Sequence, residues 1–534
     1  MTHHPKSIFK FTEQPKKHRR GSFLTWILCL SAALGFAAAL DQKPIVPDAQ
    51  EVYRPTWESL TSHPMPEWLL DAKFGIYAHW GVYSVPAFET EWYAKRMYEQ
   101  DSPVYKHHLA VFGNPSRFGY KDFIPQFRAE KYNPADWAEL IEASGARYAG
   151  MAVVHHDGFL LWDSNLNRWN AKRMGPKRDV YGELVVALRQ RGLKTIATEH
   201  HLRTFNWYVP GSDGFGVLKD SQAAGKLVRE AGWDLNDPRF ADLYWNELAG
   251  KRYADFLVEW QAKVREVIDK YQPDLFWFDG GDFRGKDSEK IVLDLLCHYH
   301  NRSAAWKKPV EVLNKLAGNK IWNFVENYGM LTFEEGRDRE AATARPWIDD
   351  MKISDKGWGY IEGQKYKAAD EIVDGLVDRV ARGGGLLLNL SPKADGTIPD
   401  EQKQALREVG AWLKVNGEAI YGTRPWSVSA EGDEVKLRRG RQWVFLRCDA
   451  SDIRFTRSKD GATLYVICLG VPQNELRIKS LRRSAGSMPK VIKDISLLGS
   501  DQKIEWKQEA EALIIRAPAN VPCRQAAAFK VMLE

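Results

Sequence analysis

The chain has 534 residues, of which 44% are hydrophobic, 27% charged and 12% aromatic, values typical of a globular protein that exclude collagen, coiled coil and intrinsic disorder. Its length allows about two to four domains. The net charge is +6, but residues 1–39 alone hold six lysines and arginines and one glutamate, so the remainder is nearly neutral. A basic nucleic-acid-binding protein is therefore excluded as the default, and no nucleic-acid partner is predicted.

The N-terminal residues have the pattern of a secretory signal. A basic stretch that ends at Arg19-Arg20 precedes an apolar run from Phe23 to Leu40, which contains Ala37-Ala38-Ala39 as a small-residue cleavage site. The run is also close to the length that spans a bilayer, so a retained signal anchor is the alternative. We predict a signal peptide at 1–39 and a linker at 40–56. The protein is then exported to the periplasm or the exterior (a lysosome in a eukaryote), without stable membrane insertion after cleavage.

Cysteine usage leaves the redox state open. Cys29 lies in the predicted signal, and Cys297, Cys448, Cys468 and Cys523 remain in the body of the chain. One disulfide among the last three is compatible with an oxidising compartment, and four buried free thiols are equally compatible.

From residue 57 to 425, short apolar runs alternate with helical patterns. Eight candidate strands with intervening helices predict an α/β fold, namely a (β/α)8 TIM-like barrel over 57–425. The rival, a doubly wound open sheet, needs a glycine-rich phosphate loop after the first strand, and none is present. The candidate strands are Phe74–His79, Tyr148–His155, Thr195–His200, Asp274–Asp279, Val310–Asn314, Ile321–Val325, Trp347–Ile353 and Leu386–Leu390. The candidate helices are a segment that opens at Asn133-Pro134, then Val180–Arg191, Tyr253–Tyr271, Ala368–Ala381 and Asp400–Val415.

After Pro425-Trp426 the pattern becomes β-rich. The runs Val435–Leu437, Trp443–Leu446 and Thr463–Ile467 are separated by Gly, Asp and Ser, and helical periodicity is scarce. Residues 426–534 are therefore predicted to form an antiparallel β-sandwich domain. This domain either binds sugar or packs against the barrel, and we favour the packing role because no aromatic stripe distinguishes a binding face.

Polar residues gather at the predicted ends of the barrel strands. Catalytic groups of a TIM-like barrel lie at the C-terminal ends of its strands, so these residues are candidates for the site. The ends carry His79-Trp80-Gly81, His155-His156-Asp157-Gly158, Glu199-His200-His201 and Asp279-Gly280-Gly281, and the seventh strand carries Trp347 with Asp349 and Asp350.

This set of residues favours sugar chemistry over metal or serine chemistry. Adjacent histidines on a strand point to opposite faces, so we do not expect His155 and His156 to share an ion, and no metal or other cofactor is predicted. No GxSxG elbow occurs. Neutral histidines and Trp faces suit sugar hydroxyls and rings, and a carboxylate pair hydrolyses glycosides. Asp279, after the apolar run 274–278, is the best candidate for a nucleophile; the alternative is an Asp that only caps the Gly280-Gly281 turn.

Several segments then resemble one known family. The stretch Phe74–Phe88, with the sequence FGIYAHWGVYSVPAF, resembles the opening signature of the α-L-fucosidases, glycoside hydrolase family 29, and the resemblance runs in order over roughly residues 55–430. Its further motifs are Glu91-Trp92-Tyr93, Tyr120-Lys121-Asp122-Phe123, His155–Phe159 with Leu161–Ser164, Trp277–Gly280, Gly383–Pro392, Asp395–Pro399 and Asn416–Thr423.

The resemblance implies a retaining exo-glycosidase that hydrolyses terminal α-L-fucose from glycans or glycoconjugates through a covalent glycosyl-aspartate, with a fucosylated glycan as partner. It implies that Asp279 is the nucleophile. Its acid/base position falls on Glu334, with Glu335 as the alternative and Glu326 and Glu340 less favoured. The residues that it implies bind the fucose hydroxyls are His79, Glu91, Trp92, His155 and His156.

Three departures from the family pattern bear on specificity. Glu199 precedes His200 where many members have Tyr, Lys315 stands where many have Arg, and the seventh strand carries Trp347 with two aspartates where relatives often have small polar residues. We add Glu199, His200, Lys315 and Trp347 to the predicted sugar-binding set. The glycan linkage and the oligomeric state stay open. The alternatives are a related exo-α-L-glycosidase, such as an α-L-galactosidase, and a non-catalytic exported carbohydrate-binding protein on the same barrel.

Overall fold

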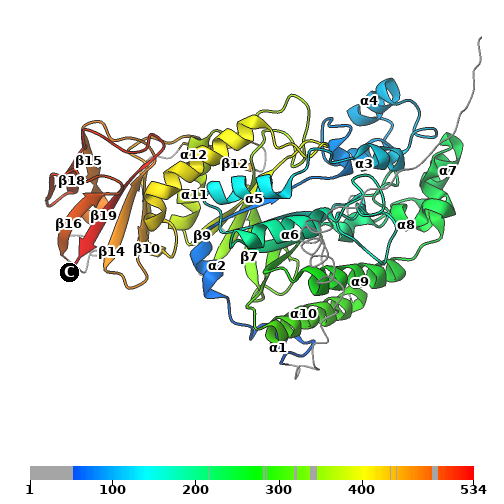
Figure 1. The fold of residues 1–534 in the computed structure, drawn as a ribbon, viewed down its shortest axis with the longest axis horizontal. Coiled ribbons are helices and arrows are strands. Elements are labelled where there is room, and N and C mark those ends of the chain that lie inside the picture. Colours follow the sequence, from blue (N-terminus) through cyan, green and yellow to red (C-terminus); the bar gives the residue numbers. More distant parts are fainter. Residues whose placement is uncertain are drawn as a thin grey trace, which may run out of the picture. The chain divides into compact units, whose positions relative to one another are not determined.

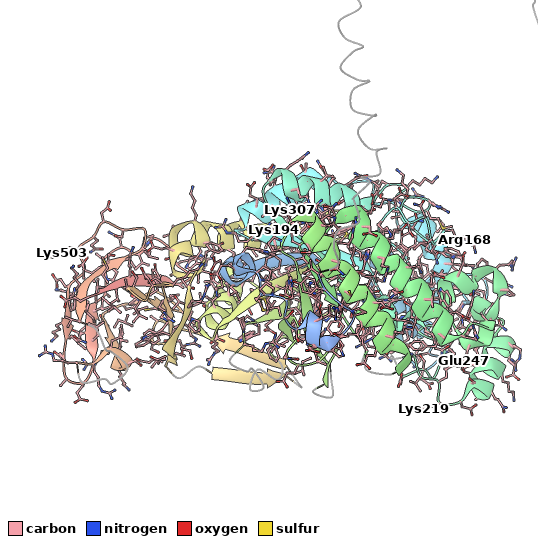
Figure 2. All side chains as sticks on the ribbon, turned by 90° about the horizontal axis from the view of Figure 1, so that it is seen from below. Arg168, Lys194, Lys219, Glu247, Lys307 and Lys503 are labelled. Atoms are coloured by element: carbon pink, nitrogen blue, oxygen red, sulfur yellow. The ribbon has the colours of Figure 1, made fainter. Side chains whose placement is uncertain are left out.

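The computed structural model of the protein describes residues 52–213, 216–280, 283, 286–317, 321–336, 345–432, 435–439, 442–483 and 491–534. The predicted signal peptide and most of the predicted linker lie outside the described residues. Across the described part of the chain, no helix combines the length and the apolar character that crossing a membrane requires. Charged side chains such as Arg168, Lys219, Glu247 and Lys503 are exposed at its surface (Figure 2).

Eight parallel strands close into a barrel, as the alternating sequence pattern predicts. They are β1 (Phe74–Ala78), β2 (Tyr148–Val154), β3 (Lys194–Glu199), β4 (Leu275–Phe278), β5 (Glu311–Ala317), β7 (Met330–Glu334), β8 (Trp347–Lys352) and β9 (Gly384–Leu390). Each strand pairs with the next in this order, and β9 closes the barrel by pairing with β1.

Side chains alternate between the inside of this barrel and its outer face. The interior cluster includes Tyr77, Tyr148, Trp277, Leu313 and Leu387, one from each of five strands. Gly75 is inward as well, and a Cβ there would come 2.1 Å from the Tyr148 ring, so this position needs glycine. The barrel is thus filled by side chains rather than open, as expected for eight strands.

Helices surround the strands and share one large hydrophobic cluster with the outward-facing residues (Figure 1). Their starts follow ordinary capping chemistry: Asn133 accepts a hydrogen bond from the Ala135 amide, and Asp179 accepts one from Gly182. The helices are α1 (Trp57–Leu60), α2 (Glu67–Ala72), α3 (Tyr93–Arg96), α4 (Pro103–Val111), α5 (Pro134–Ala143), α6 (Val180–Gln190), α7 (Ser221–Ala231), α8 (Ala241–Tyr244), α9 (Tyr253–Tyr271), α10 (Lys286–Trp306), α11 (Ala369–Ala381) and α12 (Asp400–Asn416).

The sixth barrel strand is not the one that the sequence pattern predicted. The run Ile321–Val325 was expected to fill this place, but only β6 (Ile321–Trp322) forms there, and it pairs antiparallel with the end of β5. The barrel strand is β7, which pairs in parallel with both β5 and β8. Both runs are short and apolar, so composition alone does not separate them. The consequence is functional, because Glu334 lies at the end of a barrel strand rather than in a loop.

The C-terminal residues form antiparallel sheets around a second core. Five strands pair in the order β10 (Arg424–Glu431), β13 (Ile453–Arg457), β14 (Thr463–Cys468), β19 (Ala527–Leu533) and β16 (Ile492–Leu497). Three more pair as β15 (Glu475–Ile478), β18 (Leu513–Arg516) and β17 (Trp506–Gln508), and β11 (Val435–Arg439) pairs with β12 (Gln442–Arg447). Phe455, Val466 and Ile515 pack between the five-stranded and three-stranded sheets, so this is the predicted sandwich.

Buried contacts connect this domain to the barrel. Arg454 of β13 and Asp378 of α11 form a fully buried ion pair of 2.7 Å, and Trp412 of α12 donates a hydrogen bond to the Ala526 carbonyl oxygen. Trp426 and Trp506 pack against the sandwich core.

The open question about cysteines is answered for the described residues, where Cys297, Cys448, Cys468 and Cys523 are all free thiols.

Candidate active site

The barrel periodicity brings one group of polar side chains together. Inward-facing core residues are followed two positions later by polar residues at the C-terminal strand ends, because side chains alternate with a period of two. Tyr77 is followed in this way by His79, Trp277 by Asp279 and Leu313 by Lys315. The same count leads from Ile348 to Asp350, and twice that count, which keeps the same face, leads from Ile196 to His200 and from Met330 to Glu334.

Asp279 lies directly after β4 and is held by two partners. Its Oδ1 lies 2.6 Å from Lys315 Nζ, its Oδ2 lies 3.0 Å from His200 Nδ1, and its amide donates a hydrogen bond to the Glu199 carbonyl oxygen. Burial by itself would raise the pKa of Asp279, but Lys315 and His200 outweigh it and hold this pKa well below its usual range. The carboxylate is therefore ionised throughout the neutral range.

Lys315 joins this carboxylate to a second one. Its Nζ lies 3.0 Å from Glu334 Oε2, and its side chain is only 9% exposed. Burial alone would lower the pKa of Lys315, but Asp279, Glu334 and Asp350 raise it. The ammonium also lies 5.1 Å from the Trp277 ring centroid, within cation–π range. One buried cation thus contacts both candidate catalytic carboxylates.

The histidines form the wall beside Asp279. The His155 and His156 ring centroids lie 4.2 Å apart, and His79 lies 4.9 Å from His200 and 5.5 Å from His155. Burial lowers the pKa of His79 to about 3 and lowers those of His155, His156 and His200 as well. At neutral pH each ring therefore offers one donor and one acceptor to a ligand hydroxyl.

The expectation that His155 and His156 point to opposite faces is wrong. β2 ends at Val154, and its register with β3 shifts between Ala152 and Val154, so strand alternation has stopped before the two histidines. Among the described residues, ligand atoms of His79, His155 and His200 all lie within 4.8 Å of one another and could hold a metal ion. A dication there would lie close to the Lys315 ammonium, which opposes it.

Glu91 and Trp92 reach the same pocket from the segment after β1. The Trp358 amide donates a hydrogen bond of 3.0 Å to Glu91 Oε2, and the Trp358 ring lies 5.6 Å from His79. Trp92 contacts His156 and Trp207 edge to face. The sequence arguments missed Trp207 and Trp358, which lie in loops without a strand-end signal.

Tyr77 and Arg203 were also missed, whereas Asp350 was among the strand-end candidates. The Tyr77 hydroxyl donates a hydrogen bond of 3.2 Å to Asp350 Oδ2, and burial raises the pKa of Asp350 well above its usual range. Arg203 lies close to Gly280, where an added Cβ would come 2.2 Å from the guanidinium Nε. The inward phase of β1 would have indicated Tyr77, whereas Arg203 lies in the short helical turn His201–Thr204 after β3, where strand alternation has ended.

Other predicted residues lie away from this cluster. Glu335 pairs with Lys352 at 3.3 Å, and Glu326 is exposed, whereas Glu340 lies outside the described residues. Trp347 begins β8 instead of ending it, so it lies at the opposite end of the barrel, beside Gly384. The predicted role of Trp347 in binding sugar does not fit that position.

Glu199 lies behind the cluster rather than in it. It shares the outward phase of Ala197, accepts a hydrogen bond of 2.7 Å from the His201 amide, and interacts with Lys263 of α9. The predicted contact of Glu199 with the sugar does not fit this outward direction. Burial raises the pKa of Glu199 to about 8, so this carboxyl is largely protonated at neutral pH.

Comparisons with known proteins match this chain to one family. The family model described as alpha-L-fucosidase matches residues 42–418, and the one described as alpha-L-fucosidase C-terminal domain matches residues 449–532. The tissue alpha-L-fucosidase of Rattus norvegicus is 29% identical over 476 residues, which cover 88% of this chain and 89% of that protein. The plasma alpha-L-fucosidase of Homo sapiens is 30% identical over 485 residues, which cover 88% of this chain and 91% of that protein. The crystal structure of Thermotoga maritima alpha-fucosidase in complex with fucose has 29% identity and a TM-score of 0.67, with 90% of this chain and 100% of that chain covered.

The pKa of Glu199 makes a prediction for stability. A carboxyl whose folded pKa is raised contributes stability below its unfolded pKa, and that contribution is lost as the pH rises toward about 8. Glu199→Gln removes the titration, so we expect the variant and the wild type to unfold alike in urea near pH 4.5. At pH 8 the variant should be more stable by about 4 kcal/mol. The matched control is Glu247→Gln at an exposed position, and a stability difference that does not change with pH contradicts the assignment.

Proposed function

The chain belongs to the α-L-fucosidase family of glycoside hydrolases, and on that premise we propose that it releases terminal α-L-fucose from glycans or glycoconjugates with retention of configuration. Asp279 is the nucleophile of this proposal and Glu334 its acid/base. The family membership supports the sugar, and the arrangement around Lys315 supports the two catalytic roles.

The bridging position of Lys315 is the observation that carries the proposal. Since Asp279 Oδ1 and Glu334 Oε2 both lie within 3.0 Å of its Nζ, their separation is at most the sum of the two contacts. The two oxygens are therefore closer than the carboxyl groups of inverting enzymes, which lie about 6.5–9.5 Å apart to leave room for a water molecule. The geometry therefore favours a covalent glycosyl-enzyme over direct attack by water.

The chemistry follows in two steps. An Asp279 oxygen bonds to the anomeric carbon while the bond to the leaving oxygen breaks, and Glu334 gives that oxygen its proton. Glu334 then takes a proton from water, whose oxygen bonds to the anomeric carbon and releases Asp279. The neutral histidines hold the sugar hydroxyls in both steps, and Trp92 and Trp358 supply aromatic faces.

Lys315 affects the two carboxylates differently in this mechanism. Its ammonium keeps Asp279 ionised, as a nucleophile requires, but the same contact also favours ionised Glu334. Glu334 must carry a proton in the first step, so we propose that the bound sugar separates Glu334 from Lys315. The shorter contact, to Asp279, then remains.

A second candidate is an exo-α-L-galactosidase, which one observation favours. α-L-Galactose differs from α-L-fucose by one additional hydroxyl on C6, and this pocket holds a buried polar pair, Tyr77 with Asp350. Asp350 Oδ1 is buried and has no hydrogen-bond partner among the described residues, so it could accept a further hydroxyl.

Export and the domain division also belong to this proposal. The match to the family begins at residue 42, after the predicted signal at 1–39, which supports that boundary. The barrel at 57–425 and the sandwich at 426–534 stay predictions as to their limits, and the fucosylated glycan is the proposed partner.

Turnover of 4-nitrophenyl α-L-fucoside tests the reaction. We expect the wild type to hydrolyse it and Asp279→Gly to lose at least about 10³-fold in kcat, because the covalent step is gone. Azide should restore part of the rate, since the shortened side chain leaves room for a small nucleophile. Asp501→Gly, in the C-terminal domain, is the matched control and should keep full activity.

The matching α-L-galactoside, assayed in parallel, decides between the two sugars. Preference for the galactoside replaces the fucosidase proposal with the second candidate. No turnover of either sugar favours the carbohydrate-binding alternative, and full activity of Asp279→Gly removes the nucleophile assignment.

The acid/base assignment predicts a dependence on the leaving group. Glu334→Gln should keep most of its activity on a fucosyl fluoride, whose leaving group needs no proton, and lose at least about 10²-fold on an alkyl fucoside. Glu335→Gln is the matched control, because its carboxylate pairs with Lys352 rather than with Lys315. If Glu335→Gln shows the leaving-group dependence and Glu334→Gln does not, Glu335 is the acid/base.

A further inference from the structure

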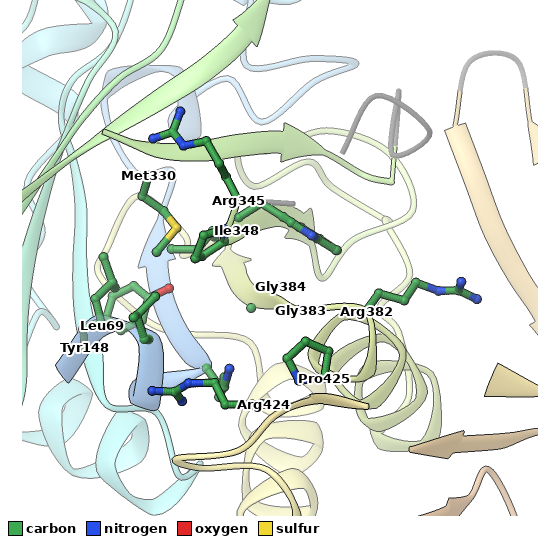
Figure 3. A pocket seen from close by; sticks show the side chains of 15 residues that line it. Leu69, Tyr148, Met330, Arg345, Ile348, Arg382, Gly383, Gly384, Arg424 and Pro425 are labelled. Atoms are coloured by element: carbon green, nitrogen blue, oxygen red, sulfur yellow. The ribbon is translucent and has the colours of Figure 1, made fainter. Parts of the chain in front are cut away.

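A second cavity lies at the end of the barrel opposite the candidate active site (Figure 3). Its wall includes the residue before β1 and the first residues of β2, β7, β8 and β9, whereas the active site follows the last residues of the strands. The cavity has a volume of about 300 Å³, at the lower end of the range for sites that hold small organic ligands.

The wall of this cavity is largely apolar. Tyr148 of β2, Met330 of β7, and Trp347 and Ile348 of β8 line it from the barrel, and Pro425 lines it from the start of β10. Gly384 lies against the Trp347 ring, and an added Cβ would come 2.6 Å from that ring. Because glycine has no side chain, it does not cover the ring. A flat apolar body therefore finds matching surfaces here.

The charged side chains in the wall are all cationic. Lys73, Arg345, Arg382 and Arg424 line the cavity, and no aspartate or glutamate of the described residues does. Arg424 is neutralised from outside the wall by Glu67 and Asp71, and Arg382 by Asp378. The side chain of Arg345 donates hydrogen bonds to the backbone carbonyl oxygens of Glu326 and Gly329.

Lys73 is the exceptional member of this set. It is only 8% exposed, and no described residue gives its ammonium a hydrogen bond or an ion pair. Its nearest acidic neighbours, Asp71 and Glu67, are already bound by Arg424 and Lys459. Burial, assisted by the charge of Arg424, lowers the pKa of Lys73 to about 8, so the group is still mostly charged at neutral pH.

The backbone fixes Lys73 in this place. Its φ is 59°, its carbonyl oxygen accepts a hydrogen bond from Leu386, and a Cβ on Gly385 would come 2.9 Å from that oxygen. The backbone of Lys73 is therefore held at the edge of the cavity. The ammonium has no partner among the described residues and lies in a largely apolar wall, so an anion that enters the cavity would supply the missing partner.

We propose that this cavity binds a small organic carboxylate with a flat apolar body, whose carboxylate pairs with Lys73 and whose body lies against Trp347. The apolar wall disfavours inorganic phosphate, which needs hydrogen-bond donors on all sides. The site is separate from the proposed glycosidase centre and does not depend on it.

Calorimetric titration of the full chain with naphthalene-2-carboxylate at pH 7 tests this site. We expect one-to-one binding, at least about tenfold weaker binding of the neutral naphthalene-2-carboxamide, and a loss of at least about tenfold in Lys73→Met. Lys365→Met, at an exposed position, is the matched control and should bind like the wild type. Equal affinity for the two probes, unchanged affinity in Lys73→Met, or no binding of the carboxylate overturns the proposal.

A second measurement keeps the test independent of how Lys73→Met folds. In the wild type at pH 8, trace acetylation followed by mass spectrometry should modify Lys73 at least about fivefold more slowly when the carboxylate is present, because the ion pair blocks the amine. Acetylation of Lys365 should not change. An unprotected Lys73, or a probe that competes with an α-L-fucoside, overturns the assignment.

Discussion

The ammonium of Lys315 is the contact on which the candidate active site depends. It is buried at the mouth of a filled barrel and touches Asp279 and Glu334 at once, so two carboxylates that would repel each other stay close. Removal of this charge would leave two buried acids without compensation, and desolvation would then favour their protonated forms. The same cation explains why Asp279 is ionised although it is buried. For Asp350, which has Tyr77 as its hydrogen-bond donor, burial outweighs the attraction of Lys315 and raises the pKa well above its usual range.

Barrel closure and side-chain alternation place most of these groups, and the register shift at the end of β2 accompanies His155 and His156. Inward-facing apolar or aromatic residues of several strands are followed, two or four positions later, by a polar side chain at the C-terminal end. The opposite end of the barrel uses the same periodicity for a different surface, where Trp347 and Met330 begin their strands and Lys73 precedes β1. One set of strands therefore supports an anionic catalytic cluster at one end and a cationic cavity at the other.

Much of this arrangement follows from the sequence. The alternation of apolar runs and helices predicts the barrel, and the strand-end residues predict His79, His200 and Asp279 as parts of one site. The sixth strand is not predictable in this way, because Ile321–Val325 and Met330–Glu334 have similar composition and only closure of the barrel selects the second. The direction of side chains is the other source of error. Glu199 and Trp347 were added to the site as departures from the family pattern on their strands, but Glu199 faces α9 and Trp347 begins its strand.

Mass spectrometry of a trapped intermediate tests the central claim most directly. The protein is incubated with 2-deoxy-2-fluoro-L-fucosyl fluoride, whose C2 fluorine slows both steps while its anomeric fluoride still leaves, so that a covalent intermediate accumulates. The account predicts one fluorofucosyl group per chain, carried by the peptide that contains Asp279, and none in Asp279→Asn. A label on another carboxylate, or complete turnover without any labelled peptide, would contradict a nucleophile held by Lys315.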